Sequence, residues 1–191
     1  MRRLVLIITS AAVVATLSSA IKPPPIRFLW NVSASVPTGL YALTDAAQAS
    51  PGDRVVLRPP ETMHALLAER GYLKPGTPLI KTVAAVAGQR VCRTKHRIII
   101  DGKRAGTARK RDSEGRPLPK WHGCQTLHAD QLFLMNLAAP DSFDGRYFGP
   151  VDRSLITARA VPLWTDERGD GRRMWFADPH HIDPSSTPKG Q

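Results

Sequence analysis

The sequence predicts a mainly β, antiparallel domain, and three observations carry this prediction. Short runs rich in Val, Ile, Leu and aromatic residues recur along the chain, with Pro, Gly, Asp or Asn between them. Only one internal segment, near residues 61–70, has the apolar periodicity of a helix. Apolar residues make up 42% of the 191 residues, which is enough for one packed domain. We therefore expect an antiparallel β fold with one short helix, preceded by an N-terminal hydrophobic helix.

The first 22 residues predict a signal peptide or a membrane anchor. Residues 1–3 are basic at two positions, and residues 4–21 carry no charge. A stretch of this length lies at the lower limit for a membrane-spanning helix, and the small residues at 18–20 also suit a cleavage site. In both cases the basic end stays in the cytoplasm and the rest of the chain is exported. The Pro-rich residues 22–25 then form a stiff spacer.

The following elements are expected in chain order. Met63, Leu66 and Leu67 share one face of the expected helix, and Gly71 ends it. Residues 97–103 predict a strand followed by a hairpin turn. The expected strands are 26–30, 40–43, 54–57, 78–88, 97–100, 131–136 and 156–164.

Two polar segments complete the plan of the chain. Residues 103–120 are basic and rich in Gly and Pro, so we expect an exposed loop. Residues 166–191 are rich in Asp, Arg, Gly, Ser and Pro, a composition typical of a disordered tail. The folded domain between the N-terminal segment and this tail is therefore expected at residues 23–165.

The stretch 31–41 contains the first candidate site. In an extended segment, residues two apart point to the same face, so Ser33 and Ser35 would present both hydroxyl groups to one side. Pro37 lacks a backbone donor and Gly39 permits backbone shapes that other residues resist. An ordinary Ser-rich turn is the alternative interpretation. A serine hydroxyl needs a base before it becomes a nucleophile.

Lys81 is the candidate base. It is the only charged residue in the apolar run 78–88. A strand lysine commonly lies at a sheet edge or extends to water. Here its neighbours are apolar on both sides, and burial disfavours the charged ammonium form. The pKa of a free lysine is about 10.4, so the pKa must fall by several units before the amine can act as a base near neutral pH. A buried lysine beside a serine is a recognised nucleophile–base arrangement.

These two stretches resemble a known family. Ser-Val-Pro-Thr-Gly-Leu-Tyr (35–41) and Leu-Ile-Lys-Thr-Val-Ala-Ala-Val-Ala-Gly (79–88) are similar to motifs of the signal peptidase superfamily (S26) of Ser/Lys proteases. The pattern Ser-x-Pro-x-Gly-x-Tyr is closer to its TraF-type, pilin-processing branch than to housekeeping signal peptidase I, and residues 118–124 resemble that branch too. The resemblance covers about residues 28–164 and implies the signal-peptidase β fold in a reduced form.

The resemblance implies a role for each candidate residue. Ser35 attacks the scissile carbonyl and Lys81, held neutral, takes its proton. The Ser33 hydroxyl and the backbone N–H of Ser35 hold the oxyanion. The dyad is thus expected to work without a metal or a cofactor.

Residues 141–151 resemble the third motif of the superfamily, Ser-x-Asp-x-Arg-Tyr-x-Gly. In that motif the serine is placed to hydrogen-bond the catalytic lysine, and the aspartate and arginine brace the site. The resemblance assigns these supporting roles to Ser142, Asp144 and Arg146. Gly145 stands where a serine is common in the superfamily.

The chain has two cysteines, Cys92 and Cys124. A matched pair in an exported chain predicts a disulfide, which would stabilise the fold by roughly 3–4 kcal/mol. Two unrelated buried thiols are the alternative. Without matched histidines, the pair does not predict a zinc site.

The resemblance also implies substrate and location. The expected substrate is an exported protein, above all the pilin precursor of a conjugative transfer (type IV secretion) apparatus, whose other components would be further partners. The enzyme would act at the periplasmic face of the inner membrane, or in the periplasm if the N-terminal segment is removed. A general type I signal peptidase and a non-catalytic periplasmic pilus-assembly factor are the alternatives.

The net charge of +11 and a pI near 10.4 suit an anionic partner or an anionic membrane surface. Aromatic residues are sparse, at 6%, and no glycine–aromatic nucleic-acid motif is present in the sequence. We therefore expect no nucleic-acid partner.

Overall fold

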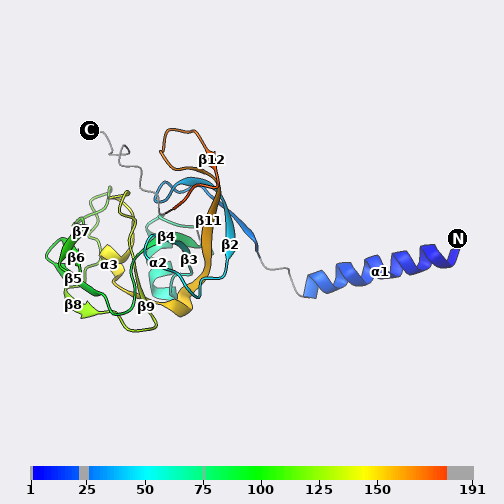
Figure 1. The fold of residues 1–191 in the computed structure, drawn as a ribbon, viewed down its shortest axis with the longest axis horizontal. Coiled ribbons are helices and arrows are strands. Elements are labelled where there is room, and N and C mark those ends of the chain that lie inside the picture. The colour runs from blue at the N-terminus through cyan, green and yellow to red at the C-terminus, as the bar shows by residue number, and fades with distance from the viewer. Residues whose placement is uncertain (1, 22–25, 75, 180–191) are drawn as a thin grey trace.

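A computed structural model describes residues 2–21, 26–74 and 76–179. It confirms a mainly β architecture whose paired strands are antiparallel. Figure 1 shows a β body with α2 and α3 beside it and the N-terminal helix α1 extending away from it. The elements are α1 (Arg2–Ile21), β1 (Phe28–Asn31), β2 (Thr38–Thr44), β3 (Arg54–Leu57), α2 (Glu61–Glu69), β4 (Leu79–Ala85), β5 (Arg90–Thr94), β6 (Arg97–Ile100), β7 (Lys103–Thr107), β8 (Gly123–Thr126), β9 (Gln131–Leu134), α3 (Gly145–Phe148), β10 (Val151–Asp152), a 3-10 turn (Arg153–Leu155), β11 (Ile156–Asp166) and β12 (Met174–Trp175).

The main sheet has the strand order β1-β2-β11-β3-β4-β9-β10, and β12 extends it by pairing with β11. Its central strand β3 is buried along its whole length, so both of its faces are covered. Val55 and Leu57 pack into one apolar cluster and Val56 into another, as the two-residue period of a strand requires. The long strand β11 lies between β2 and β3 and so joins the C-terminal part of the chain to its beginning.

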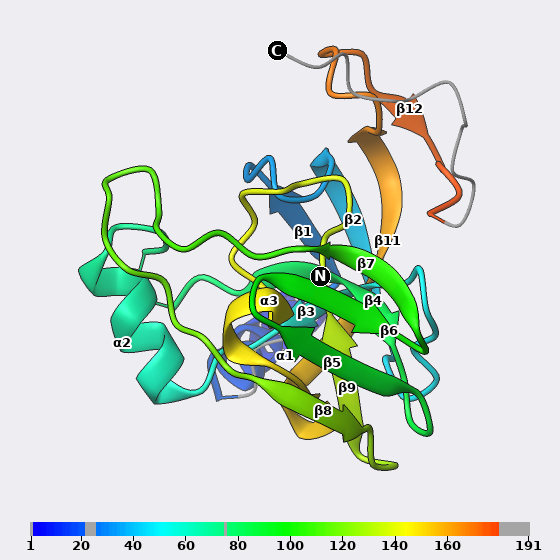
Figure 2. The ribbon, with the colours of Figure 1, turned by 90° about the vertical axis from the view of Figure 1, so that its left-hand side faces the viewer.

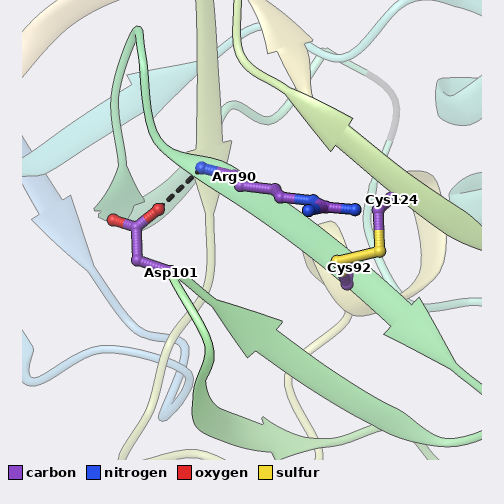
Figure 3. The surroundings of a disulfide bond; sticks show 4 residues. All are labelled: Arg90, Cys92, Asp101 and Cys124. Atoms are coloured by element: carbon purple, nitrogen blue, oxygen red, sulfur yellow. Dashed lines mark hydrogen bonds between the residues drawn. A yellow bond between two sulfur atoms is a disulfide. The ribbon is translucent and has the colours of Figure 1, made fainter.

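The smaller sheet has the order β7-β6-β5-β8 and faces the viewer in Figure 2. Its edge strand β8 is fully exposed and buries no side chain of its own. Cys92 on β5 and Cys124 on β8 are opposite each other in the register and form a disulfide, which Figure 3 shows. The predicted cysteine pairing is confirmed. At the start of β5, the Arg90 N–H donates to the Asp101 carboxylate at 2.7 Å and so holds the β6–β7 turn.

Gly39 sets the close approach of β2 to β11. Its φ of 136° lies in the region that favours glycine, and it pairs with Thr165. A Cβ at this position would come within 2.2 Å of the Trp164 carbonyl oxygen. The glycine of the Ser-x-Pro-x-Gly-x-Tyr pattern is therefore needed for strand packing just after the serine turn.

The N-terminal helix is present, as predicted, and its apolar side chains such as Leu6, Ile7 and Val14 are exposed. Within the described residues, no helix combines the length and the hydropathy that a membrane span requires. The interpretation of residues 1–22 as a signal peptide or an anchor stays a prediction, and residues 22–25 lie outside the described residues.

Several local predictions need correction. Residues 103–107 form β7 rather than a loop, and the rest of the expected loop folds over the domain with Ala108 buried. Strands β5 and β8 were not predicted, because their polar residues hide the two-residue period. The expected turn after β9 contains the short helix α3. The tail predicted as disordered from residue 166 is folded in its first part, since β12 pairs with β11; residues 180–191 lie outside the described residues.

The disulfide should contribute measurably to stability, because it closes a 32-residue separation on an exposed edge strand that has little packing of its own. Replacing both Cys92 and Cys124 by serine should lower the free energy of unfolding by about 3 kcal/mol. Urea denaturation of this variant and of wild type, with and without reductant, measures the effect. Reductant should destabilise only the wild type. Equal stability of the two proteins would contradict this prediction.

Candidate active site

The serine turn, the first half of β4 and the loop before α3 line one cavity of about 700 Å³. Ser33 and Ser35 reach it from the turn between β1 and β2, and Lys81 reaches it from β4. Its other walls are the chain after α2, residues 109–118 and the stretch 141–147. The segment 109–118 is held on the far wall by two contacts with the chain after α2: the Tyr72 hydroxyl donates to the Asp112 carboxylate, and Arg116 Nη2 donates to the Arg70 carbonyl oxygen at 3.2 Å. Four predicted site residues therefore gather at one cavity although they are far apart in sequence: Ser33, Ser35, Lys81 and Ser142.

Lys81 is buried at the centre of the main sheet, with 2% of its surface exposed. It pairs with Val55 on β3, and both of its sequence neighbours on β4 are apolar or half-buried. Its Nζ donates a hydrogen bond to Ser142 Oγ at 2.8 Å. Burial lowers the pKa of Lys81 to about 8, the negative charge of Asp144 opposes this shift, and the positive charge of Arg146 adds to it. A substantial fraction of the amine is thus neutral at slightly alkaline pH.

Ser142 is fixed from two sides. Asn136, at the end of the apolar run of β9, donates from Nδ2 to Ser142 Oγ at 3.2 Å. The Oδ1 atom of Asn136 accepts the backbone N–H of Thr82, the residue after Lys81, at 2.8 Å. One amide therefore ties the lysine strand to the hydroxyl that contacts the lysine.

Asp144 and Arg146 form a buried pair beneath this loop. Arg146 Nε and Nη2 both reach the Asp144 carboxylate at 2.8 Å, with exposed fractions of 2% and 0% for the two side chains. Arg146 Nη2 also donates to the carbonyl oxygen of Ala139 at 2.6 Å, and Nη1 donates to that of Pro140 at 3.1 Å. Asp144 in turn caps α3 by accepting the Arg146 N–H at 3.1 Å. The pair holds an irregular loop that has few backbone hydrogen bonds of its own.

The serine turn lies outside the strands, which corrects the expectation of an extended segment. The Ser33 Oγ nevertheless donates to Ser35 Oγ at 3.1 Å, and the Ser35 N–H points to Ser33 Oγ at 3.4 Å. The two hydroxyls meet because the turn folds back on itself. Ser35 is half-buried and Ser33 is exposed at the mouth of the cavity.

Ser35 and Lys81 line the same cavity, but across the described residues no hydrogen bond joins the two side chains. Such contacts are often long in the absence of substrate and tighten when it binds. The described residues contain no cluster of three His, Cys, Asp or Glu side chains that could hold a metal ion.

Two residues that support the site were missed by sequence reasoning. Asn136 could have been found from its place, since a polar amide ends an otherwise apolar strand run. Trp121 donates from Nε1 to the Gly145 carbonyl at 2.9 Å and fixes the start of α3.

Gly145 has no room for a side chain, because a Cβ would lie 2.6 Å from the Leu134 carbonyl oxygen. Its departure from the common serine is therefore explained by packing.

Comparison with known proteins gives consistent matches. The family model described as signal peptidase, peptidase S26, matches residues 1–164. The "Conjugal transfer protein TraF" of Agrobacterium tumefaciens (strain 15955) is 40% identical over 178 residues, covering 86% of this chain and 97% of that protein. A "Plasmid transfer protein TraF" of Escherichia coli is 34% identical over 145 residues, covering 71% and 81%. Among solved structures, a signal peptidase I from Enterococcus faecalis V583 is similar, with 15% identity, a TM-score of 0.33, and coverage of 58% of this chain and 94% of that one.

The buried amine should make Lys81 a destabilising residue below its folded-state pKa. The pKa of Lys81 in the folded protein is about 8, against 10.5 for an unperturbed lysine, so the unfolded chain binds the proton more tightly. Below about pH 8 the folded protein carries the full penalty, of about 3 kcal/mol. As pH rises from about 8 to about 10.5, the folded protein loses its proton first and the penalty disappears.

Lys81→Met removes this charge while filling a similar volume. At pH 7 the variant should therefore have a higher free energy of unfolding than wild type, and the gap should narrow by pH 9.5. Urea denaturation of both proteins at pH 7 and at pH 9.5 gives the difference in their free energy of unfolding at each pH. A gap that does not change with pH, or a less stable variant at pH 7, would be evidence against a strongly perturbed amine.

Proposed function

The chain belongs to the signal peptidase S26 family, and on this premise we propose that it is a serine endopeptidase with a Ser35/Lys81 dyad that processes exported precursor proteins. The observation that carries the proposal is the state of Lys81. It is buried, it faces the cavity that Ser35 lines, and its pKa is lowered to about 8. A lysine used only for structure gains nothing from losing its charge, whereas a general base requires it.

The proposed reaction uses groups that already lie at the cavity. Ser35 Oγ attacks the scissile carbonyl carbon, and its proton passes to the neutral Nζ of Lys81. The resulting ammonium gives a proton to the leaving amine, which departs as the acyl-enzyme forms. Water then attacks the ester by the same route and releases the acid product. Ser142 and Asn136 keep the amine in place during both steps.

The oxyanion is assigned to Ser33 and Ser35. The backbone N–H of Ser35 and the hydroxyl of Ser33 lie on the same side of the turn, within 3.4 Å of each other. For this role the Ser33 hydroxyl rotates its proton from Ser35 Oγ to the developing negative charge. The substrate would enter as an extended strand between the serine turn and the start of β4, where Leu29, Leu79 and Ile80 offer apolar walls.

The relatives suggest the substrate class. Two of them are named for conjugal or plasmid transfer, and a pilin precursor of such an apparatus is the proposed substrate, with other apparatus components as further partners. Cleavage by hydrolysis and cleavage coupled to joining of the pilin ends both pass through the same acyl-enzyme.

The proposed place of action is the periplasmic face of the inner membrane, or the periplasm if residues 1–22 are removed. The exposed aromatic side chains Trp30, Trp175 and Phe176 support contact with a membrane surface. The Arg173 guanidinium lies over the ring of Trp30, so a cation accompanies the aromatic cluster. Aromatic rings and cations together favour the headgroup region of a bilayer.

Ser35→Ala and Lys81→Met should each abolish processing of the pilin precursor, by at least about 10³-fold in rate, because each removes one half of the dyad. Co-expression with the precursor, followed by mass spectrometry of the product termini, measures this and also distinguishes linear from joined product. Asp130→Asn, a change at an exposed position outside the cavity lining, is the matched control and should process normally.

The same assay separates the alternatives. Wild-type processing by either folded variant would overturn the dyad. If cells carrying Ser35→Ala and cells carrying Lys81→Met both accumulate pili with unprocessed subunits, the result would instead point to a non-catalytic assembly factor. Processing of unrelated secreted precursors at equal rates would indicate a general signal peptidase. For the dyad, the rate should also rise with pH on the acidic limb towards a midpoint near the Lys81 pKa of about 8.

Ser33→Ala should lower kcat by about 10²–10³-fold and change KM little, because an oxyanion donor acts mainly on the transition state. Ser33→Thr keeps a hydroxyl and should retain more activity. Steady-state kinetics on a pilin-derived peptide compare the three proteins. If Ser33→Ala stays within about twofold of wild type in kcat, the hydroxyl is not an oxyanion donor.

A further inference from the structure

The turn that carries Ser33 and Ser35 is held mainly by one side chain. Residues 32–37 lie between β1 and β2 and belong to neither strand. Asn31 Nδ2 lies within hydrogen-bond distance of three carbonyl oxygens, those of Ser33 at 2.8 Å, Pro37 at 3.0 Å and Val36 at 3.1 Å, so two of them share one of its two hydrogens. Its Oδ1 accepts the backbone N–H of Ser33 at 3.0 Å. The amide thus takes the place of the backbone hydrogen bonds that a tight hairpin would make.

The position of Asn31 explains how it reaches both ends of the turn. It is the last residue of β1, it pairs with Gly39 at the base of the hairpin, and 8% of its surface is exposed. From there the amide points into the turn and meets carbonyl groups from its start and its end. An amide suits this place because it presents donors and an acceptor on one small planar group.

A second side chain holds the far end of the turn. The Tyr41 hydroxyl, on a fully buried side chain, donates to the Pro37 carbonyl oxygen at 2.6 Å. Burial raises the pKa of Tyr41 to about 12, so the hydroxyl keeps its proton and remains a donor at working pH. Arg54 donates to the Tyr41 oxygen at 3.4 Å and pairs through both terminal nitrogens with the Glu167 carboxylate. A chain of contacts therefore runs from Glu167, the residue after β11, to the carbonyl group of Pro37 in the serine turn.

We infer that Asn31 is a positioning residue that holds the Ser35 nucleophile and the two oxyanion donors in one arrangement, with Tyr41 as its second support. The inference rests on the proposed function. Without the Asn31 amide, the carbonyl groups of Ser33, Val36 and Pro37 must turn towards water to be satisfied. The turn would then relax, and a misplacement of about 1 Å at a reacting group costs about 10²-fold in rate.

Three variants and one control test this role. Asn31→Ala removes the amide, and Asn31→Asp keeps its size and its acceptor but loses the donors to the three carbonyl oxygens. Tyr41→Phe removes only the hydroxyl. Thr157→Val is the control, because it deletes a single side-chain hydrogen bond to the Val56 carbonyl elsewhere in the same sheet.

The full chain is assayed for kcat and KM on a pilin-derived peptide and for hydrogen–deuterium exchange. Asn31→Ala and Asn31→Asp should each lower kcat by about 30–100-fold and leave KM within about threefold. Tyr41→Phe should lower kcat by about fivefold, the effect of one hydrogen bond. Exchange should rise in the peptide covering residues 31–38 and not in the second sheet. The control should change neither quantity.

The outcomes are separable. A role limited to filling space predicts that Asn31→Asp behaves like wild type, and a kcat within about threefold for both Asn31 variants would overturn the inference. If the Asn31 variants fail to fold, Tyr41→Phe decides, and an unchanged kcat overturns it. If wild type cleaves no precursor, the proposed function fails instead. Hydrogen–deuterium exchange in residues 31–38 then tests only the claim that Asn31 keeps the turn in one conformation. If Asn31→Asp exchanges as slowly as wild type there, this claim is overturned too.

Discussion

The desolvation of Lys81 is the constraint on which the rest of this structure depends. A lysine at the centre of a sheet, between strands that are buried on both faces, destabilises the folded state while its amine is charged. The surrounding strands provide the apolar setting, and the stretch from Asn136 to Arg146 provides the few polar partners that the amine has. The main sheet thus determines the chemistry of the amine, and an irregular loop determines its direction.

That loop is stabilised by side chains rather than by backbone pairing. Arg146 satisfies several carbonyl groups that a regular element would satisfy through its own backbone, and Asp144 balances its charge inside the protein. A buried ion pair is costly to form and more costly to break, so it is weak evidence for stability and better evidence for a single defined conformation. The serine turn follows the same plan, with an uncharged amide in the central place. Each half of the candidate dyad therefore lies on an irregular segment or contacts one, and each segment is held by a buried polar side chain.

Much of the architecture could be predicted from sequence, and the misses have physical causes. The bounds of β3 agree with the prediction and those of α2 agree to within one residue, because β3 is a β-rich run, α2 has helical periodicity, and Pro and Gly residues bound both segments. Strands β5 and β8 are rich in polar residues: β5 buries only Val91 and Arg93, and β8 buries no side chain, so the disulfide and pairing with β5 hold β8 in place. The residue types of the site could be predicted from the motif pattern, but the meeting of Ser33 with Ser35 follows from a folded turn that periodicity does not describe. The contribution of Glu167 could not be predicted. The segment around it has the composition of a tail, and its partner Arg54 lies over a hundred residues away in the sequence.

The link from Glu167 through Arg54 and Tyr41 to the serine turn also has a consequence for the order in which the protein is made. The turn is among the first parts of the domain to leave the ribosome, whereas β11 and Glu167 are among the last. Strand β2 cannot complete its pairing until β11 arrives, and a non-local contact of this kind forms late in folding. The link from Glu167 to the serine turn is therefore completed only after almost the whole chain has been delivered. On the proposed function, a chain still being synthesised carries Ser35 on a turn that lacks part of its support, so the site is complete only when the domain is.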